Sequence, residues 1–316
     1  MLEKWLKCGL IFKKELFPTE EGTPQGGIIS PTLANMALDG IQLILAERYK
    51  RRCIKGKHIS PMVNFVRYAD DFIVTSADRD VLENEIKPLL TEFLAQRGLV
   101  LSEEKTLITH IDDGFDFLSF NIRKYKGVLL TKPSNAKVKT FLDGIRSVIE
   151  ENKSCKQETL IRMLNPKITC WANYYRSGAS SETFHHVDDQ IFCKLWQWAK
   201  RRHPKKGKHW IANRYFQRIR NRSWRFAVTF DRSRKKDVFP LKLMTDVNII
   251  RHKKITGAAN PFDPEWNGYF QERKTYKMLL SLKGRKSLLY IWNQQKRLCP
   301  ICGKLITKDT QWNVRE

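Results

Sequence analysis

The stretch NFVRYADDFIVT, residues 64–75, decides how the first part of this chain is expected to fold. Two apolar runs, Phe65-Val66 and Phe72-Ile73-Val74, stand on either side of Ala69-Asp70. Aromatic and β-branched residues favour strands, and aspartate favours turns. We therefore predict two short antiparallel strands joined by a tight turn.

The predicted turn carries two adjacent carboxylates, Asp70 and Asp71. Like charges held close together disfavour ionisation, and a divalent cation would offset that repulsion. Carboxylate oxygens are ligands that Mg²⁺ prefers, and pairs of Mg²⁺ ions ~3.5–4 Å apart support phosphoryl transfer. An isolated Asp-Asp pair is more often a solvated turn, so the pair alone leaves both interpretations open.

Helical patterns surround this hairpin. Residues 28–50 are predicted as one helix, with Ser30 as its cap and Pro31 at its first position. A second helix is predicted over 80–97, ended by Gly98, with short strands at 99–101 and 107–108. Alternation of helices with hairpin strands to about residue 130 indicates an α+β fold, an antiparallel sheet with helices on one side.

The rest of the chain changes in character. Apolar residues recur at helical spacing from about 134 to 200, which predicts a mainly helical domain. The segment 200–236 contains 15 Lys and Arg residues against the single acid Asp231. No internal repeat is apparent.

The composition points to a polyanionic partner. The formal charge of the 316 residues is +25, from 58 Lys and Arg against 33 Asp and Glu, which favours nucleic acid. A membrane surface is the alternative, but no apolar run reaches the ~20 residues of a spanning helix. The first residues lack a secretory cleavage pattern, and five scattered cysteines suit reduced thiols, so a cytoplasmic protein is expected.

Three further motifs accompany the hairpin. A glycine-rich loop, Gly22-Thr23-Pro24-Gln25-Gly26-Gly27, runs into a helix start, where backbone N–H groups favour an anionic ligand. The other two motifs are SEEKT at 102–106 and FDFLSF at 115–120.

Together these segments resemble a known family. GTPQGGIISPTLANMALDG, FVRYADDFIVT, GLVLSEEKTLITH and FDFLSF are similar to four successive motifs of the reverse transcriptases encoded by bacterial and organellar group II introns. The resemblance implies a partial right-hand polymerase palm within the α+β part of the chain.

The resemblance also implies roles for individual residues. Asp70 is a primary Mg²⁺ ligand, Asp71 its weaker neighbour, and Tyr68 lies beside the primer end. Lys105 lies near the triphosphate, where a cation helps the leaving pyrophosphate; the alternative is a solvated surface lysine. The pocket for the incoming nucleotide and template is formed by Pro24, Gln25, Gly26 and Gly27.

The resemblance continues into a thumb or maturase domain that binds intron RNA and the template–primer. Aromatic rings stack on unpaired bases while cations contact phosphates, although a core role for the tryptophans is an equal alternative. The expected RNA-binding residues are Trp171, Tyr174, Tyr175, Arg176, Lys205, Lys206, Lys208, Arg218, Arg220 and Arg222.

The segment LCPICG resembles the opening of an HNH endonuclease module. Cys299 and Cys302 form an incomplete zinc half-site, since a structural site takes four ligands and no Cys or His follows Cys302. We therefore do not expect Zn²⁺ in this chain, and the expected cofactor is Mg²⁺.

The expected domains are a partial palm at 1–130, a helical thumb or maturase domain at 131–235, a basic DNA-binding region at 236–290 and a truncated HNH start at 291–316. The family's first palm motif and its fingers are not found upstream, and Ser119 stands where the family usually has glycine. A chain truncated at both ends is expected, with little polymerase activity alone.

The expected function is RNA-directed DNA polymerase and intron-splicing maturase of a mobile group II intron, by two-Mg nucleotidyl transfer. The alternative is a catalytically inactive RNA-binding remnant. The implied partners are the intron RNA, an RNA template with a DNA primer, target DNA and dNTPs, without a membrane, in a cytoplasmic ribonucleoprotein. A homodimer is left open.

Overall fold

The computed structural model of the chain describes residues 9–12, 15–17, 30–50, 52–54, 57–59, 62–219, 222–232, 235–250, 252–257 and 259–314. The chain divides into two compact units, residues 1–247 and 248–316. Each unit is described by itself below. Helices and antiparallel sheets occur together, which confirms the predicted α+β class.

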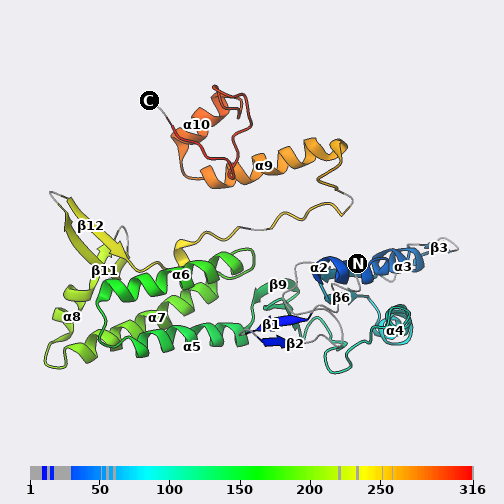
Figure 1. Ribbon diagram of the computed structural model, residues 1–316, viewed down its shortest axis with the longest axis horizontal. Helices are drawn as coiled ribbons and strands as arrows, with labels where there is room; N and C mark the ends of the chain where they lie inside the picture. The colour runs from blue at the N-terminus through cyan, green and yellow to red at the C-terminus, as the bar shows by residue number, and fades with distance from the viewer. Residues whose placement is uncertain are drawn as a thin grey trace. The chain divides into compact units, whose positions relative to one another are not determined.

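The first part of unit 1 is built from small hairpins and helices (Figure 1). Each hairpin is a two-stranded antiparallel sheet. The elements are β1 (Leu10–Phe12), β2 (Glu15–Phe17), α2 (Ser30–Ala37), α3 (Ile41–Arg48), β3 (Arg52–Ile54), β4 (Lys57–Ile59), β5 (Asn64–Tyr68), β6 (Asp71–Thr75), the π-helix η1 (Val81–Ile86) and α4 (Lys87–Ala95).

The single helix predicted over residues 28–50 is wrong, because a break at Asp39-Gly40 divides α2 from α3. Gly40 has a φ of 96°, a left-handed conformation that side chains with a Cβ rarely adopt. A Cβ at Gly40 would also lie 3.7 Å from the Phe93 ring. The glycine therefore lets the chain turn between the two helices while α4 packs closely against the turn.

The strands predicted at 99–101 and 107–108 are also wrong, since both segments are irregular. The Leu99 amide closes the end of α4 by donating to the Leu94 carbonyl oxygen, at 3.0 Å. Val100 and Leu107 are exposed, and neither pairs with a neighbouring strand in the part of the chain that is described. An apolar run without a partner strand cannot satisfy its backbone groups in a sheet.

A small core holds the first part together. Its buried members come from the turn after α2, from α3, η1 and α4, and the inward residues of the β5–β6 hairpin pack against them. The buried members are Leu38, Ile41, Leu45, Ile86, Leu90, Phe93 and Leu94.

A three-stranded antiparallel sheet follows: β7 (Phe115–Phe117), β8 (Phe120–Tyr125) and β9 (Val128–Pro133). Leu118 and Ser119 form the first turn with φ values of 47° and 68°. Positive φ at both central residues is the geometry that closes a two-residue hairpin. Ser119 therefore occupies a position for which glycine is better suited.

The helices predicted from about residue 134 to 200 are confirmed. The four helices of this part are α5 (Asn135–Glu151), α6 (Gln157–Tyr175), α7 (Ser181–Arg202) and α8 (Lys208–Tyr215), and α5, α6 and α7 lie side by side (Figure 1). They enclose a second, larger core that includes Leu160, Ile161, Leu164, Phe184 and Leu195.

The sequence did not predict the sheet that follows these helices. Strands β10 (Phe216–Ile219), β11 (Arg222–Arg232) and β12 (Lys235–Pro240) pair antiparallel. Phe216 and Phe226 from this sheet are buried in the helical core. The sheet therefore belongs to the helical domain, and the sequence-based boundary at 235/236 cuts through β12. The 3-10 turn η2 (Met244–Asp246) ends this part.

Unit 2 contains the 3-10 turn η3 (Pro264–Trp266) and the helices α9 (Asn267–Leu282) and α10 (Lys286–Gln294). Met278, Leu282 and Trp292 form its buried core. Among the described residues of the whole chain, no helix is long and apolar enough to span a membrane.

Candidate active-site turn and nucleic-acid interface

The β5–β6 hairpin has the predicted form. Tyr68 pairs with Asp71 at its end, and Ala69 with Asp70 makes the two-residue turn. Ala69 has a φ of 53°, which suits a tight hairpin turn. Both aspartates and the Tyr68 side chain are exposed, with Tyr68 at 65%. The residues expected to do chemistry therefore lie at one accessible tip.

Among the described residues, the hairpin packs against the core from one face. Phe65 and Phe72 are diagonal neighbours on the two strands, with ring centroids 5.7 Å apart, and both pack against the core of α3 and α4. Residues at alternate positions face the opposite side, because side chains alternate along a strand. Val66 is on that side and is 56% exposed.

Arg67 ties the turn to helix α2. Its Nη1 donates to Asn35 Oδ1 at 3.1 Å and to the Ala69 carbonyl oxygen at 3.2 Å. The Ala69 carbonyl lies directly before Asp70, so this guanidinium fixes the backbone that carries the carboxylates. The sequence analysis did not identify Arg67, although a cation three residues before Asp70 was a visible signal.

The donor set of the turn suits a magnesium ion in kind but is incomplete. Asp70 and Asp71 offer carboxylate oxygens, the hard ligands that Mg²⁺ takes. Across the described residues, no group of three His, Cys, Asp or Glu side chains could hold a metal ion. Two adjacent carboxylates therefore provide a partial site.

Of the remaining expected active-site residues, the structure describes Lys105 but not the glycine-rich loop. Lys105 lies exposed in the turn 103–105, and in the described part of the chain no ion pair joins it to the hairpin. The expected nucleotide and template residues Pro24, Gln25, Gly26 and Gly27 lie outside the described residues.

Two of the expected RNA-binding rings are part of the helical core. Trp171 packs between Phe141 and Tyr175, with centroids 5.0 Å and 4.2 Å away. Tyr175 is only 3% exposed, so its ring cannot stack on a base in this conformation. For these two residues the structure favours the core alternative.

Tyr174 and Tyr175 have a different role that the sequence did not indicate. The Tyr174 hydroxyl donates to the Leu118 carbonyl oxygen at 2.8 Å, and the Tyr175 hydroxyl donates to the Ser119 carbonyl oxygen at 3.3 Å. Burial raises the pKa of the Tyr175 hydroxyl, which keeps it protonated as a donor. The end of α6 therefore holds the β7–β8 turn in place. The Tyr174 ring is 53% exposed, and Arg176 is half-buried beside it.

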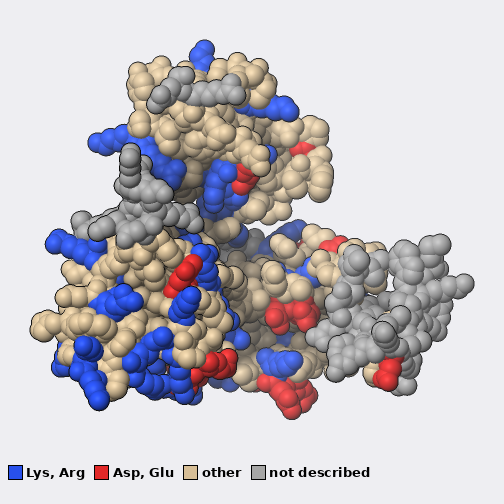
Figure 2. All heavy atoms as spheres, turned by 60° about the vertical axis from the view of Figure 1, so that its left-hand side comes forward, with Lys and Arg blue, Asp and Glu red and all other residues tan. Residues whose placement is uncertain are grey.

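The expected cations beyond α7 are accessible. Lys205, Lys206, Lys208, Arg218 and Arg222 are exposed, whereas Arg220 lies outside the described residues. Lys206 lies over the Trp210 ring, 5.5 Å from its centroid. Figure 2 shows Lys and Arg side chains gathered over the helical part of unit 1, where few acidic side chains lie among them. This surface suits a polyanion.

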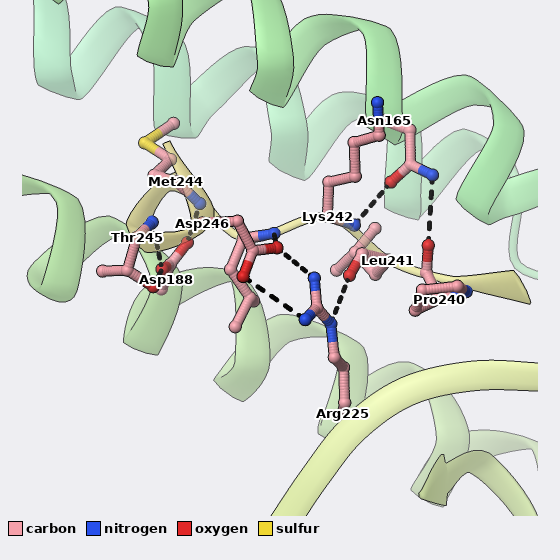
Figure 3. Close-up of polar contacts among 10 residues, drawn as sticks. Asn165, Asp188, Arg225, Pro240, Leu241, Lys242, Met244, Thr245 and Asp246 are labelled. Carbon is pink, nitrogen blue, oxygen red and sulfur yellow. Dashed lines mark hydrogen bonds and ion pairs between the residues drawn. The ribbon is translucent and has the colours of Figure 1, made fainter. Parts of the chain in front are cut away.

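A polar network holds the segment after β12 against the helices (Figure 3). Asn165 of α6 donates to the Pro240 carbonyl oxygen at 3.2 Å and accepts from the Lys242 amide at 2.7 Å. Arg225 of β11 donates to the Leu241 carbonyl oxygen at 2.9 Å and pairs with Asp246. One helix and one strand therefore hold this short segment.

Asp188 of α7 completes this network. It is 8% exposed and accepts hydrogen bonds from the Met244 amide at 2.8 Å, the Thr245 amide at 3.1 Å and the Thr245 hydroxyl at 2.7 Å. Burial raises the pKa of Asp188, although these hydrogen bonds lower it. The sequence signal was an acid between Phe184 and Ile191 on an apolar helix face.

The two cysteines of unit 2 lie in a preformed turn. The Cys299 amide donates to the Lys304 carbonyl oxygen and the Gly303 amide donates to the Cys299 carbonyl oxygen, both at 2.8 Å. Hydrogen bonds from the backbone of Cys302 and Ile301 lower the pKa of the Cys299 thiol. The turn offers two thiol ligands, which is half of a structural zinc site.

Two family models match this chain. The model described as reverse transcriptase (RNA-dependent DNA polymerase) matches residues 1–122, which contain the Asp70-Asp71 hairpin. The model described as group II intron, maturase-specific domain matches residues 138–216, which contain most of α5 to α8. The chain thus combines a reverse transcriptase domain with a maturase-specific domain.

Curated relatives agree. Protein YkfC of Escherichia coli (strain K12) is 33% identical over 146 residues, covering 39% of this chain and 38% of the relative. Group II intron-encoded protein LtrA of Lactococcus lactis subsp. cremoris is 26% identical over 208 residues, covering 50% of this chain and 35% of the relative. Together these matches support a group II intron-encoded reverse transcriptase and maturase, and the chain spans little more than a third of the length of these relatives.

Proposed function

We propose that this chain contributes the palm and thumb of an RNA-directed DNA polymerase that also acts as the splicing maturase of a mobile group II intron. The observation that carries the proposal is the exposed Asp70-Asp71 turn, held on a packed hairpin. It lies in the same chain as a helical domain with an exposed basic surface. An active-site turn and a polyanion surface are two of the parts that copying an RNA strand requires.

In this proposal the two aspartates bind magnesium. Bound Mg²⁺ would supply charge stabilisation of the attacking and leaving oxygens in two-metal nucleotidyl transfer. Asp70 and Asp71 provide carboxylate oxygens for it. Arg67 holds the backbone directly before them, because it donates to the Ala69 carbonyl oxygen and to Asn35 of α2. Tyr68 offers an exposed ring beside the turn for the primer end, and Lys105 offers a cation for the triphosphate.

The binding partners follow from the surface chemistry. Exposed cations beyond α7 contact phosphates of the intron RNA, of the RNA template with its DNA primer, and of target DNA. The exposed Tyr174 ring is suited to stacking on an unpaired base. The substrates are dNTPs, and the protein acts in a cytoplasmic ribonucleoprotein.

A second candidate function is RNA binding without polymerisation. The observation in its favour is that the helical domain has its own core, separate from the core under the β5–β6 hairpin. The RNA-binding part could therefore remain folded and active while the catalytic site is incomplete.

Primer extension separates the two candidates. The purified chain is incubated with poly(rA)/oligo(dT), dTTP and Mg²⁺, beside Asp70→Ala and the matched control Asp113→Ala, which removes another exposed acid outside the hairpin. Extension that Asp70→Ala abolishes and Asp113→Ala retains supports the polymerase. Absence of extension from the unaltered chain, with RNA still bound, supports the RNA-binding candidate.

A further inference from the structure

Unit 1 contains an open groove of about 780 Å³ that none of the described residues predicted as catalytic, nucleic-acid-binding or metal-binding lines. Three parts of the fold form it: the β8–β9 hairpin, one face of α5 and one face of α7. Its apolar lining residues include Val138, Leu142 and Ile191. Its polar neighbours include Asn121, Asn135 and Gln190, whose amides can donate or accept hydrogen bonds.

The rims of the groove are basic. Five cations line it, one each from β8, β9 and α7 and two from α5, against two acids. The cations are Arg123, Lys132, Lys139, Arg146 and Lys194, and the acids are Asp143 and Glu182.

One of the two acids is already neutralised. Lys132 Nζ lies 3.1 Å from Glu182 Oε2, so these two charges offset each other. Arg146 pairs with Glu150 at 3.7 Å, but both side chains are about half exposed, and such surface pairs are weak. Among the described residues, Lys139 and Lys194 have no ion-pair partner. The groove therefore presents unpaired positive charge.

The lining residues are spread along α5 and α7, so the groove is elongated. On α7 the lining residues Glu182, His186, Gln190 and Lys194 recur every four positions, which is one face of a helix. On α5 the lining runs from Asn135 to Arg146, about 16 Å along the axis at 1.5 Å per residue. Phosphates of one stacked strand advance ~3.4 Å each, so about five fit beside this length.

We propose that this groove is a second nucleic-acid site, which binds the sugar–phosphate backbone of a single strand. Cations on its rims contact phosphates, and the amides of its polar lining reach sugar hydroxyls. The proposal rests on the proposed function only in taking nucleic acid as the partner. It adds a site distinct from the cations at 205–222.

The distance between the two sites gives the proposal a spatial consequence. Lys194 is the lining residue of α7 nearest to the end of the helix at Arg202, and the eight residues of helix from one to the other span about 12 Å. Figure 1 shows α8 at the far end of α7 from the β8–β9 hairpin. One strand that follows α7 therefore contacts first the groove and then the basic segment.

The test measures binding of 20-nucleotide fluorescent oligo(rA) and oligo(dA) by the full chain over a series of salt concentrations. The groove variant is Lys139→Gln, Arg146→Gln and Lys194→Gln together. The matched control is Lys137→Gln, Lys153→Gln and Lys167→Gln, three exposed lysines outside the groove. Both variants lose the same charge.

The expected result is a change of slope for the groove variant alone. Each phosphate contact on a single strand contributes ~0.7 to the slope of log affinity against log salt, so three contacts account for ~2. At 0.1 M salt, loss of these three contacts corresponds to a decrease in oligonucleotide affinity of up to about 100-fold. The proposal is overturned if the groove and control variants weaken binding equally, because net charge alone would then explain the effect.

A footprint on the unaltered chain avoids any effect of substitution on folding. Acetylation of lysines, read by mass spectrometry, is compared with and without oligo(rA). Protection of Lys139 and Lys194, with Lys137 and Lys153 still modified, supports the groove. Equal modification with and without oligonucleotide rejects it. The oligo(dA) arm shows whether the sugar hydroxyl contributes.

These outcomes are independent of polymerase activity. Extension without a groove effect rejects the groove and keeps the polymerase. A groove effect without extension rejects the polymerase for this chain and keeps the groove.

Discussion

Replacing Asp188 with alanine is expected to destabilise the helical domain strongly. The carboxylate of Asp188 is nearly buried and accepts three hydrogen bonds from Met244 and Thr245. Alanine would leave the two backbone N–H groups of η2 without acceptors. The Thr245 hydroxyl can turn to another partner or to water, so it adds less.

The magnitude follows from the two backbone donors. An orphaned buried donor costs ~1–3 kcal/mol, so two of them cost about 4 kcal/mol together. For a domain of 150–250 residues, 1 kcal/mol shifts the melting temperature by ~2–4 °C. The expected decrease at pH 7 is therefore about 8–16 °C.

The neighbouring residue provides the control. Asp189 is exposed on the same helix, so Asp189→Ala removes the same side chain from a site without buried partners. Surface substitutions of this kind usually change stability by less than ~0.5 kcal/mol, or roughly 2 °C. The measurement is thermal unfolding followed by circular dichroism. A decrease for Asp188→Ala that is within 2 °C of the control would refute the reasoning.

Two further predictions concern the same domain. Because burial raises the pKa of Asp188 above its ordinary value of 3.8, the unfolded chain releases this proton at lower pH than the folded chain, and folding stability falls as pH rises through that interval. Urea unfolding should show the stability of the unaltered chain falling relative to Asp188→Asn from about pH 3.8 to the raised pKa, and then staying constant; a constant difference throughout would contradict the shift. Gly178→Ala should lower the free energy of unfolding by ~1–3 kcal/mol, since its Cβ would lie 2.7 Å from the Thr131 carbonyl oxygen. On α5, the Cβ of Gly144→Ala would meet nothing within 4 Å, so this variant should raise the free energy of unfolding by ~0.8–1 kcal/mol. Equal changes in melting temperature for the two glycine variants would contradict the packing at Gly178.

Features that depend on neighbouring residues could be predicted from the sequence, and features that depend on distant residues could not. The β5–β6 hairpin and its Ala69-Asp70 turn are confirmed as predicted, because neighbouring residues decide both the strands and the turn. The break at Gly40 was missed, although the glycine was visible. Whether a glycine inside a helical pattern is tolerated or breaks the helix depends on what packs beside it, here Phe93 of α4.

The candidate interface shows the same division. Exposure of the cations from Lys205 to Lys208 agrees with their charged sequence, since isolated charges stay in water. Trp171 and Tyr175 could not be assigned from the sequence, because a ring beside cations is equally compatible with stacking on a base and with packing in a core. The packing of Trp171 against Phe141, and the hydrogen bond from Tyr175 to the β7–β8 turn, assign both rings to the core.

The sequence by itself determined the strong positive charge, the adjacent carboxylates of the hairpin turn and the order of the motifs that resemble the family. Tertiary structure alone decided that α5, α7 and the β8–β9 hairpin line a basic groove. It also decided that Asp188 accepts hydrogen bonds from the backbone of Met244 and Thr245, which are more than 50 positions further along the chain. The physical reason is that turns and charge depend on neighbouring residues. Burial and hydrogen bonding between distant residues depend on which helix faces pack together.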